Sequence, residues 1–134
     1  MRSPATSRRS FVALVGRIIG CIAALSAVAL WGMFLFRNPY AAPAEGRVLL
    51  FGLLMMVAGI LSAVAAALGA HLAMYLLFFA SFFPVGLYVL AGPGVFSAIG
   101  WLNLAYLASA ILVHRPILTA KRKAARHSLT PDES

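Results

Sequence analysis

Residues 48–114 read VLLFGLLMMVAGILSAVAAALGAHLAMYLLFFASFFPVGLYVLAGPGVFSAIGWLNLAYLASAILVH and contain no Asp, Glu, Lys or Arg. A membrane helix needs roughly 20 apolar residues, so this stretch is long enough for about three spans. Gly69-Ala70-His71 and Gly92-Pro93-Gly94 divide it, because glycine and proline interrupt helices. We therefore predict membrane spans at about residues 48–69, 72–91 and 95–113.

The composition of the whole chain has the same character. Of its 134 residues, 63% are hydrophobic and only 10% are charged. Soluble domains carry about 25% charged and 45–50% apolar residues, so this chain lacks the polar surface that a soluble enzyme needs. A disordered chain is excluded for the same reason, and the single cysteine, Cys21, excludes a disulfide scaffold. The composition predicts an all-α integral membrane protein.

A fourth span is predicted before these three, at about residues 11–36, and it ends at Arg37-Asn38-Pro39. Short connections make consecutive helices antiparallel neighbours. The predicted fold is therefore a compact antiparallel bundle of four transmembrane helices. Its predicted parts are a basic N-terminus at residues 1–10, the helical domain at 11–113, and a polybasic, partly disordered tail at 114–134.

The cations indicate how the chain is oriented, because Lys and Arg beside a span stay on the cytoplasmic side. They gather before the first span and after the last, whereas the loop at residues 38–46 has none of its own, is flanked only by Arg37 and Arg47, and contains Glu45. We predict that both ends are cytoplasmic (N-in/C-in) in a bacterial cytoplasmic (inner) membrane. The flanking cations are Arg2, Arg8, Arg9 and Arg17 at the start, and Arg115, Lys121, Arg122, Lys123 and Arg126 at the end.

The net charge of +8 is also compatible with nucleic-acid binding. Here it is split between two membrane-flanking segments, which argues against a nucleic-acid partner. Juxtamembrane cations are attracted to anionic lipid by about 1 kcal/mol each. We predict contact with anionic headgroups at Lys121, Arg122, Lys123 and Arg126.

Three alternatives concern the first helix. Arg8-Arg9 followed by Phe11-Val12 resembles a twin-arginine export signal, but no soluble cargo follows it. Ala42-Pro43-Ala44 offers a small-residue cleavage site, although the preceding stretch from Ile18 to Phe36, about 28 Å long as a helix, has the length of a span. Ile18 to Cys21 resembles a lipoprotein signal, but Arg17 would lie within its apolar region. We expect the helix to be retained, with cleavage as the alternative.

Small residues recur at offsets of four, seven and eleven in two of the predicted spans. Small side chains allow helix backbones to approach closely in lipid. We predict helix packing within the chain through them, with an oligomer interface as the alternative. The two sets are Gly16, Gly20, Ala23 and Ala27, and Ala58, Ser62, Ala65 and Gly69.

Polar residues are expected near the membrane centre at Ser26, Ser62, Ser81 and Asn103. An amide at this depth is costly unless it is hydrogen-bonded. We predict that these residues form an intramembrane cluster that holds helix register, with contact to a ligand or partner as the alternative. Pro84 predicts a kink that releases a backbone carbonyl near Ala80. The Asn103 amide can donate a hydrogen bond to this carbonyl.

Two features are weak candidates for cofactor binding. His71 and His114 are both expected at cytoplasmic helix ends, where a pair of histidines can serve as ligands of a haem or a metal ion. The third predicted span is rich in aromatic residues, whose faces can stack on a quinone or pigment but more often contact lipid. We predict neither cofactor nor metal. These aromatic residues are Tyr75, Phe78, Phe79, Phe82 and Phe83.

The predicted spans contain no acidic side chain, and no cation lies deeper than Arg17. Proton relays need an ionisable group at depth, and no catalytic set is present. We predict a non-enzymatic accessory or structural subunit that acts through helix and lipid contacts within a larger membrane complex. Its partner is another membrane protein or a second copy. The alternatives are a small homo-oligomeric transporter with a polar path around Asn103, and a cofactor-binding subunit.

Overall fold

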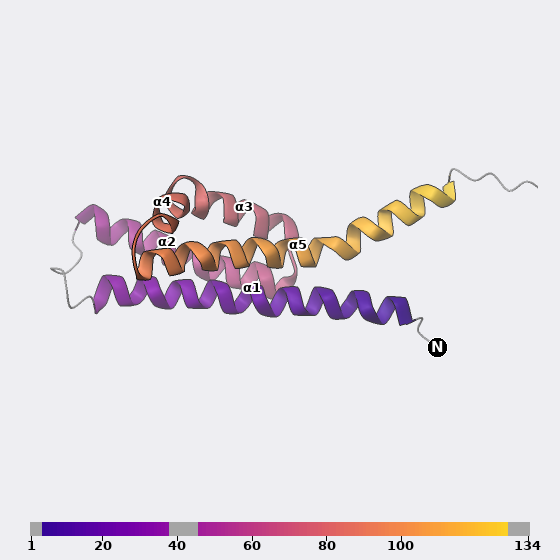
Figure 1. The fold of residues 1–134 in the computed structure, drawn as a ribbon, viewed down its shortest axis with the longest axis horizontal. Coiled ribbons are helices and arrows are strands. Elements are labelled where there is room, and N and C mark those ends of the chain that lie inside the picture. Colours follow the sequence, from indigo (N-terminus) through magenta and orange to yellow (C-terminus); the bar gives the residue numbers. More distant parts are fainter. Residues whose placement is uncertain (1–3, 38–45, 129–134) are drawn as a thin grey trace, which may run out of the picture.

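The computed structural model describes residues 4–37 and 46–128. Within these residues the regular structure is entirely helical, and none of them forms a strand. Three helices are long and apolar enough to cross a membrane: Ser10–Phe36, Gly46–Leu68 and Phe96–Ala120. They suggest a membrane protein. The elements are α1 (Pro4–Phe36), α2 (Gly46–Leu68), α3 (His71–Ser81), the π-helical turn η1 (Phe82–Gly86), α4 (Leu87–Leu90) and α5 (Val95–Ser128) (Figure 1).

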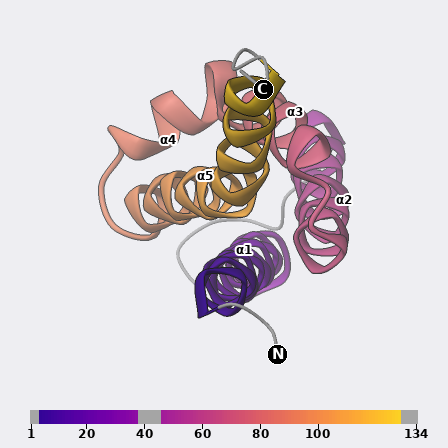
Figure 2. The same ribbon diagram turned by 90° about the vertical axis from the view of Figure 1, so that its right-hand side faces the viewer.

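The three long helices lie side by side. α1 packs against both α2 and α5, and α3 packs against α2 and α5 on the side away from α1 (Figure 2). α4 contacts α5 and lies apart from α2. The beginning of α1 and the end of α5 lie at the same end of the molecule, opposite the beginning of α2 (Figure 1).

The third apolar segment is broken rather than one straight helix over residues 72–91. Phe83 has φ −105° and ψ 126°, an extended conformation inside a helical region. The ring of Pro84 explains this, because a proline disfavours the helical conformation of the residue before it. The break leaves α3 with only 11 residues, about 16 Å, which is too short to cross a bilayer alone.

The last helix extends beyond the boundary predicted at residue 113. α5 continues through Pro116 to Ser128, so the first part of the predicted polybasic tail is helical. Pro116 cannot donate a backbone hydrogen bond, and the helix bends in this region (Figure 1). Thr119 Oγ1 donates to the Arg115 carbonyl, one turn back in the helix, at 2.7 Å. The predicted loop with Glu45 and Ala42-Pro43-Ala44 lies outside the described residues.

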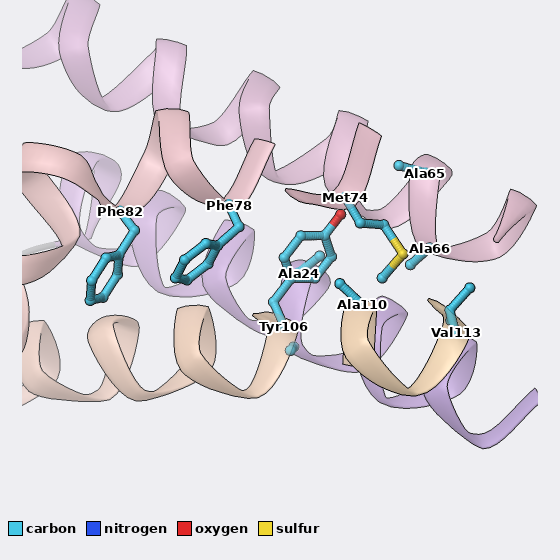
Figure 3. Packing of buried hydrophobic residues seen from close by; sticks show 10 residues of the cluster. Ala24, Ala65, Ala66, Met74, Phe78, Phe82, Tyr106, Ala110 and Val113 are labelled. Atoms are coloured by element: carbon cyan, nitrogen blue, oxygen red, sulfur yellow. The ribbon is translucent and has the colours of Figure 1, made fainter. Parts of the chain in front are cut away.

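The main core joins small residues of the long helices to large residues of the third segment (Figure 3). Met74 and Phe78 of α3 and Phe82 of η1 insert toward α5. A second cluster nearer the other end consists of Trp31, Val89 and Ile99. The small core residues are Ala23 and Ala24 of α1, Ala65 and Ala66 of α2, and Ala110 of α5.

Glycines on α1 permit the closest helix approach. A Cβ on Gly20 would lie 2.7 Å from Ser109 Oγ and 2.9 Å from Ala66 Cβ, and one on Gly16 would lie 3.0 Å from Leu112 Cβ. The small residues Gly16, Gly20 and Ala23 are therefore buried in contacts within the chain. Of the second predicted set, Ser62 and Ala65 are buried, whereas Ala58 and Gly69 are half-buried, as is Ala27 of the first set.

We expect Gly20→Ala to destabilise the protein by about 1–3 kcal/mol, the usual cost of overfilling a packed site. Gly32→Ala is the matched control, because its Cβ would meet only Met56 Cε at an ordinary 3.7 Å. Both changes improve helix propensity equally, so their difference isolates the packing cost. Thermal unfolding in detergent, followed by circular dichroism, measures both. Equal unfolding midpoints for the two variants would contradict the close packing of α1.

Candidate functional site

A small central cavity of about 30 Å³ lies among α1, α2, the broken third segment and α5. Ser62, Ser81 and Asn103 all line it, together with Trp31 and Tyr106. Three of the four residues predicted to form a polar cluster therefore meet at one place. Ser26 is not among the lining residues, and its side chain is half-buried on α1. A water needs at least about 10–15 Å³ of such space, so the cavity has room for one or two waters.

The serine hydroxyl nearest the helix break bonds to its own helix. Ser81 Oγ donates to the Leu77 carbonyl at 2.8 Å and lies 3.2 Å from the Phe78 carbonyl. Such local bonds tend to bend helices, and Ser81 is the last residue of α3 before the break. The hydroxyl is thus used locally rather than as a partner for Asn103.

Asn103 itself makes no hydrogen bond to the residues that the structure describes. The bond expected from its amide to a serine hydroxyl, or to the carbonyl near Ala80, is not formed. An amide has two donors and one acceptor oxygen, and Asn103 lines the cavity. The cavity has room beside it for a molecule of the size of water.

The structure assigns a role to Tyr106, which the sequence analysis did not single out. Its buried hydroxyl donates to the Ser62 backbone carbonyl at 3.0 Å and so links α5 to α2. Ser109 Oγ donates to the Tyr106 carbonyl at 2.7 Å. The available signal was chemical: a tyrosine within an apolar helix needs a partner for its hydroxyl.

The two histidines do meet, at the end of the molecule where α3 begins. Their rings stack with centroids 4.5 Å apart and an angle of 20° between the planes. Tyr75 meets His114 edge-on, with centroids 5.8 Å apart. The rings come from α3 and α5, so the stack joins these two helices.

This stacked geometry does not form a metal or haem site. An imidazole binds a metal through a lone pair in its own ring plane, so nearly parallel stacked rings direct their lone pairs side by side rather than at one point. Within residues 4–37 and 46–128, no three His, Cys, Asp or Glu residues are grouped as metal ligands. Cys21 instead contacts the Ala63 carbonyl through its sulfur at 3.5 Å, which packs α1 on α2.

The aromatic residues of the third segment divide between two faces. Phe78 and Phe82 are buried and stack with centroids 4.9 Å apart. Phe79 and Phe83 are exposed and stack at 6.3 Å. The predicted aromatic face is therefore half core and half surface, rather than one platform for a flat cofactor. In a bilayer the outer pair would contact lipid or a partner helix.

Among the residues predicted to contact anionic lipid, the structure describes the side chain of Arg122, which is exposed on the distal part of α5. Lys121, Lys123 and Arg126 belong to the same helix. The chain matches no protein-family model, and comparisons with curated proteins and with solved structures give no match. Its function is therefore argued from its own residues.

We expect Tyr106→Phe to lower the free energy of unfolding by about 0.5–1.5 kcal/mol, because it removes the hydrogen bond between α5 and α2. Tyr88→Phe is the control, because 84% of the Tyr88 side chain is exposed. Chemical unfolding in mixed micelles measures the difference. Equal stability of the two variants would contradict a stabilising role for the Tyr106 hydroxyl.

Proposed function

We propose that this protein is a small accessory subunit of a larger membrane complex and spans a bacterial cytoplasmic membrane four times, with both ends cytoplasmic. The fourth span in this proposal is the broken segment from His71 to Leu90, about 30 Å along its helices. The orientation is supported by cations at the end where α1 begins and α5 ends, including Arg17, Arg115 and Arg122.

The observation that carries the proposal is the outward face of α2. Only 17% of the residues in its most apolar window are buried, compared with 28% in α1 and 33% in α5. The large side chains on this face alternate in steps of four and three residues, the spacing with which one helix packs into another. More than half of each is exposed: Leu50, Leu54, Val57, Leu61, Val64 and Leu68.

The use of polar groups inside the chain also supports a role in contacts rather than in chemistry. Ser81 and Ser109 donate to carbonyls of their own helices, and Tyr106 donates from α5 to a carbonyl of α2. The described residues contain no Asp or Glu, so no carboxylate is available there for proton transfer. What this chain offers a partner is apolar helix surface.

The homo-oligomeric transporter is the second candidate, and it rests on Asn103. This residue, with its unbonded amide, lines a cavity, as a residue in a polar path would. The cavity holds only one or two waters, which is less than a path for a solute requires. The accessory role therefore has more support.

The first experiment purifies the full chain, tagged and at native expression level, in mild detergent and identifies co-migrating proteins by native electrophoresis and mass spectrometry. We expect stoichiometric co-migration with a larger membrane complex. Leu54→Ala with Leu61→Ala should reduce recovery of the partner about tenfold, because a joint loss of about 1.4 kcal/mol at the centre of an interface weakens affinity by that factor.

The matched control is Ile18→Ala with Leu25→Ala, which truncates two equally exposed residues on α1. Migration of the wild-type chain alone, as a homo-oligomer, would reject the accessory role and favour transport. Equal partner recovery from the α1 and α2 variants would reject the α2 face as the interface.

Asn103→Leu separates the two candidates further. For an accessory subunit we expect solute flux into vesicles that contain the purified chain to stay at the level of empty vesicles, with or without the substitution. Flux above that level in the wild type, abolished by Asn103→Leu, would favour the transporter.

A further inference from the structure

The side chain of Arg17 packs against the turn between α2 and α3. A Cβ built on Gly69 would lie 2.5 Å from Arg17 Nη2, 2.6 Å from Nε and 2.7 Å from Cζ. The guanidinium group therefore occupies the space that a side chain at residue 69 would take. Gly69 also has a φ of +68°, which favours glycine. The turn and the arginine thus fit each other.

The guanidinium group has donors that the described residues do not use. Arg17 Nε is buried and has no hydrogen-bond acceptor there. The two terminal nitrogens also bond to none of the described residues. Unlike Nε, they are not both buried and unbonded, so they remain accessible to a partner. A guanidinium group carries five N–H donors and stays charged at any physiological pH. A planar guanidinium group of this kind favours an anionic partner.

The residues at 4–37 and 46–128 include no Asp or Glu, so none of them supplies a carboxylate for Arg17. The acidic residues of the chain are Glu45, Asp132 and Glu133. Glu45 precedes α2, whose 23 residues extend about 34 Å to the turn at Gly69. At the other side, Gly16 lies beside Val113, and α5 runs about 21 Å further from His114 to Ser128.

The described part of α5 contains no acidic residue either, so the described residues supply no counter-ion for Arg17.

Further side chains lie close to the same turn. His71 and His114 stack beside the same turn, and Arg115 follows directly. The first backbone N–H groups of α3 point toward this end, and Ala70 at its N-cap provides no side-chain acceptor. We call Arg17, Gly69, His71 and His114 the Arg17 cluster.

The level of the cluster along the helices matches a membrane surface. From Arg17 to Arg37 along α1 is about 30 Å, and from Arg47 to Gly69 along α2 is about 33 Å. The hydrocarbon core of a bilayer is about 30 Å thick. If the loop after α1 lies at one surface, the Arg17 cluster lies among the headgroups of the other, where phosphates are the abundant anions.

We propose that the Arg17 cluster binds the phosphate of an anionic lipid headgroup. The terminal nitrogens of Arg17 donate to the phosphate oxygens, and the histidine pair forms one side of the site. A planar guanidinium group matches a phosphate with two parallel hydrogen bonds. This site is separate from the polybasic part of α5. It requires insertion into a membrane, but it does not depend on the accessory role.

The test titrates the purified, delipidated full chain in detergent with phosphatidylglycerol and, separately, with inorganic phosphate, and counts bound molecules by native mass spectrometry. We expect one tightly bound phosphatidylglycerol and no comparable binding of inorganic phosphate. Arg17→Gln should weaken the lipid affinity about tenfold or more, as expected for the loss of hydrogen bonds from a charged donor. Arg122→Gln removes the same charge from exposed α5 and should change it less than twofold.

Equal effects of Arg17→Gln and Arg122→Gln would overturn the proposal, because attraction would then depend on net charge alone. Equally tight binding of inorganic phosphate would overturn the lipid as the source of the anion. Arg17→Lys keeps the charge but loses the planar fork, and it provides the test if Arg17→Gln does not fold. Its lipid affinity should be lower than that of the wild type, and an unchanged affinity would overturn the role of the guanidinium group.

Discussion

The close approach of α1 to α5 and α2 at Gly16 and Gly20 is the contact on which the rest of the arrangement depends. In lipid, apolar side chains gain little by leaving their surroundings, so helices associate through van der Waals contact between nearby backbones. The absence of a side chain at Gly20 lets Ser109 and Ala66 reach the surface of α1. That distance in turn sets the separation of α2 from α5 and allows Tyr106 to bond across to Ser62.

Pro84 determines how the fourth element completes this packing. α3 runs beside α2 as far as Ser81, and the extended conformation of Phe83 then redirects the chain. As a result, Met74 and Phe78 pack in one core cluster and Val89 packs in the other. The first part of this segment, α3, contacts α2, and its last part, α4, contacts α5 and lies apart from α2. A straight helix would not make both sets of contacts. The same break places Ser81 and Gly86 at the central cavity.

The parts of the structure that follow from local chemistry were predictable, and those that depend on the relative rotation of helices were not. The absence of charge over residues 48–114, and the glycine at the turn before His71, place both ends of α2 and the beginning of α3 within a few residues. Pro84 indicates a kink but not its direction, because that depends on which neighbour the next residues contact. The stacking of His71 on His114 joins residues far apart in the sequence, and no spacing rule predicts it. The helical continuation to Ser128 was missed because Pro116 and the cations that follow resemble the end of a helix.

Asn103 and Arg17 both have hydrogen-bond donors that no described residue accepts. Their positions along the helices differ. Asn103 lies within the apolar part of α5, two turns from its beginning, where an ion would lose much of its hydration energy, so a neutral partner such as water suits it best. Arg17 lies about one hydrocarbon thickness from Arg37, at a level where phosphates are present and a buried cation without an anion would be costly. The same physical requirement, satisfaction of buried donors, therefore predicts hydration at one position and a bound anion at the other. Because the described residues contain no Asp or Glu, a membrane around the helices would be a source of that negative charge.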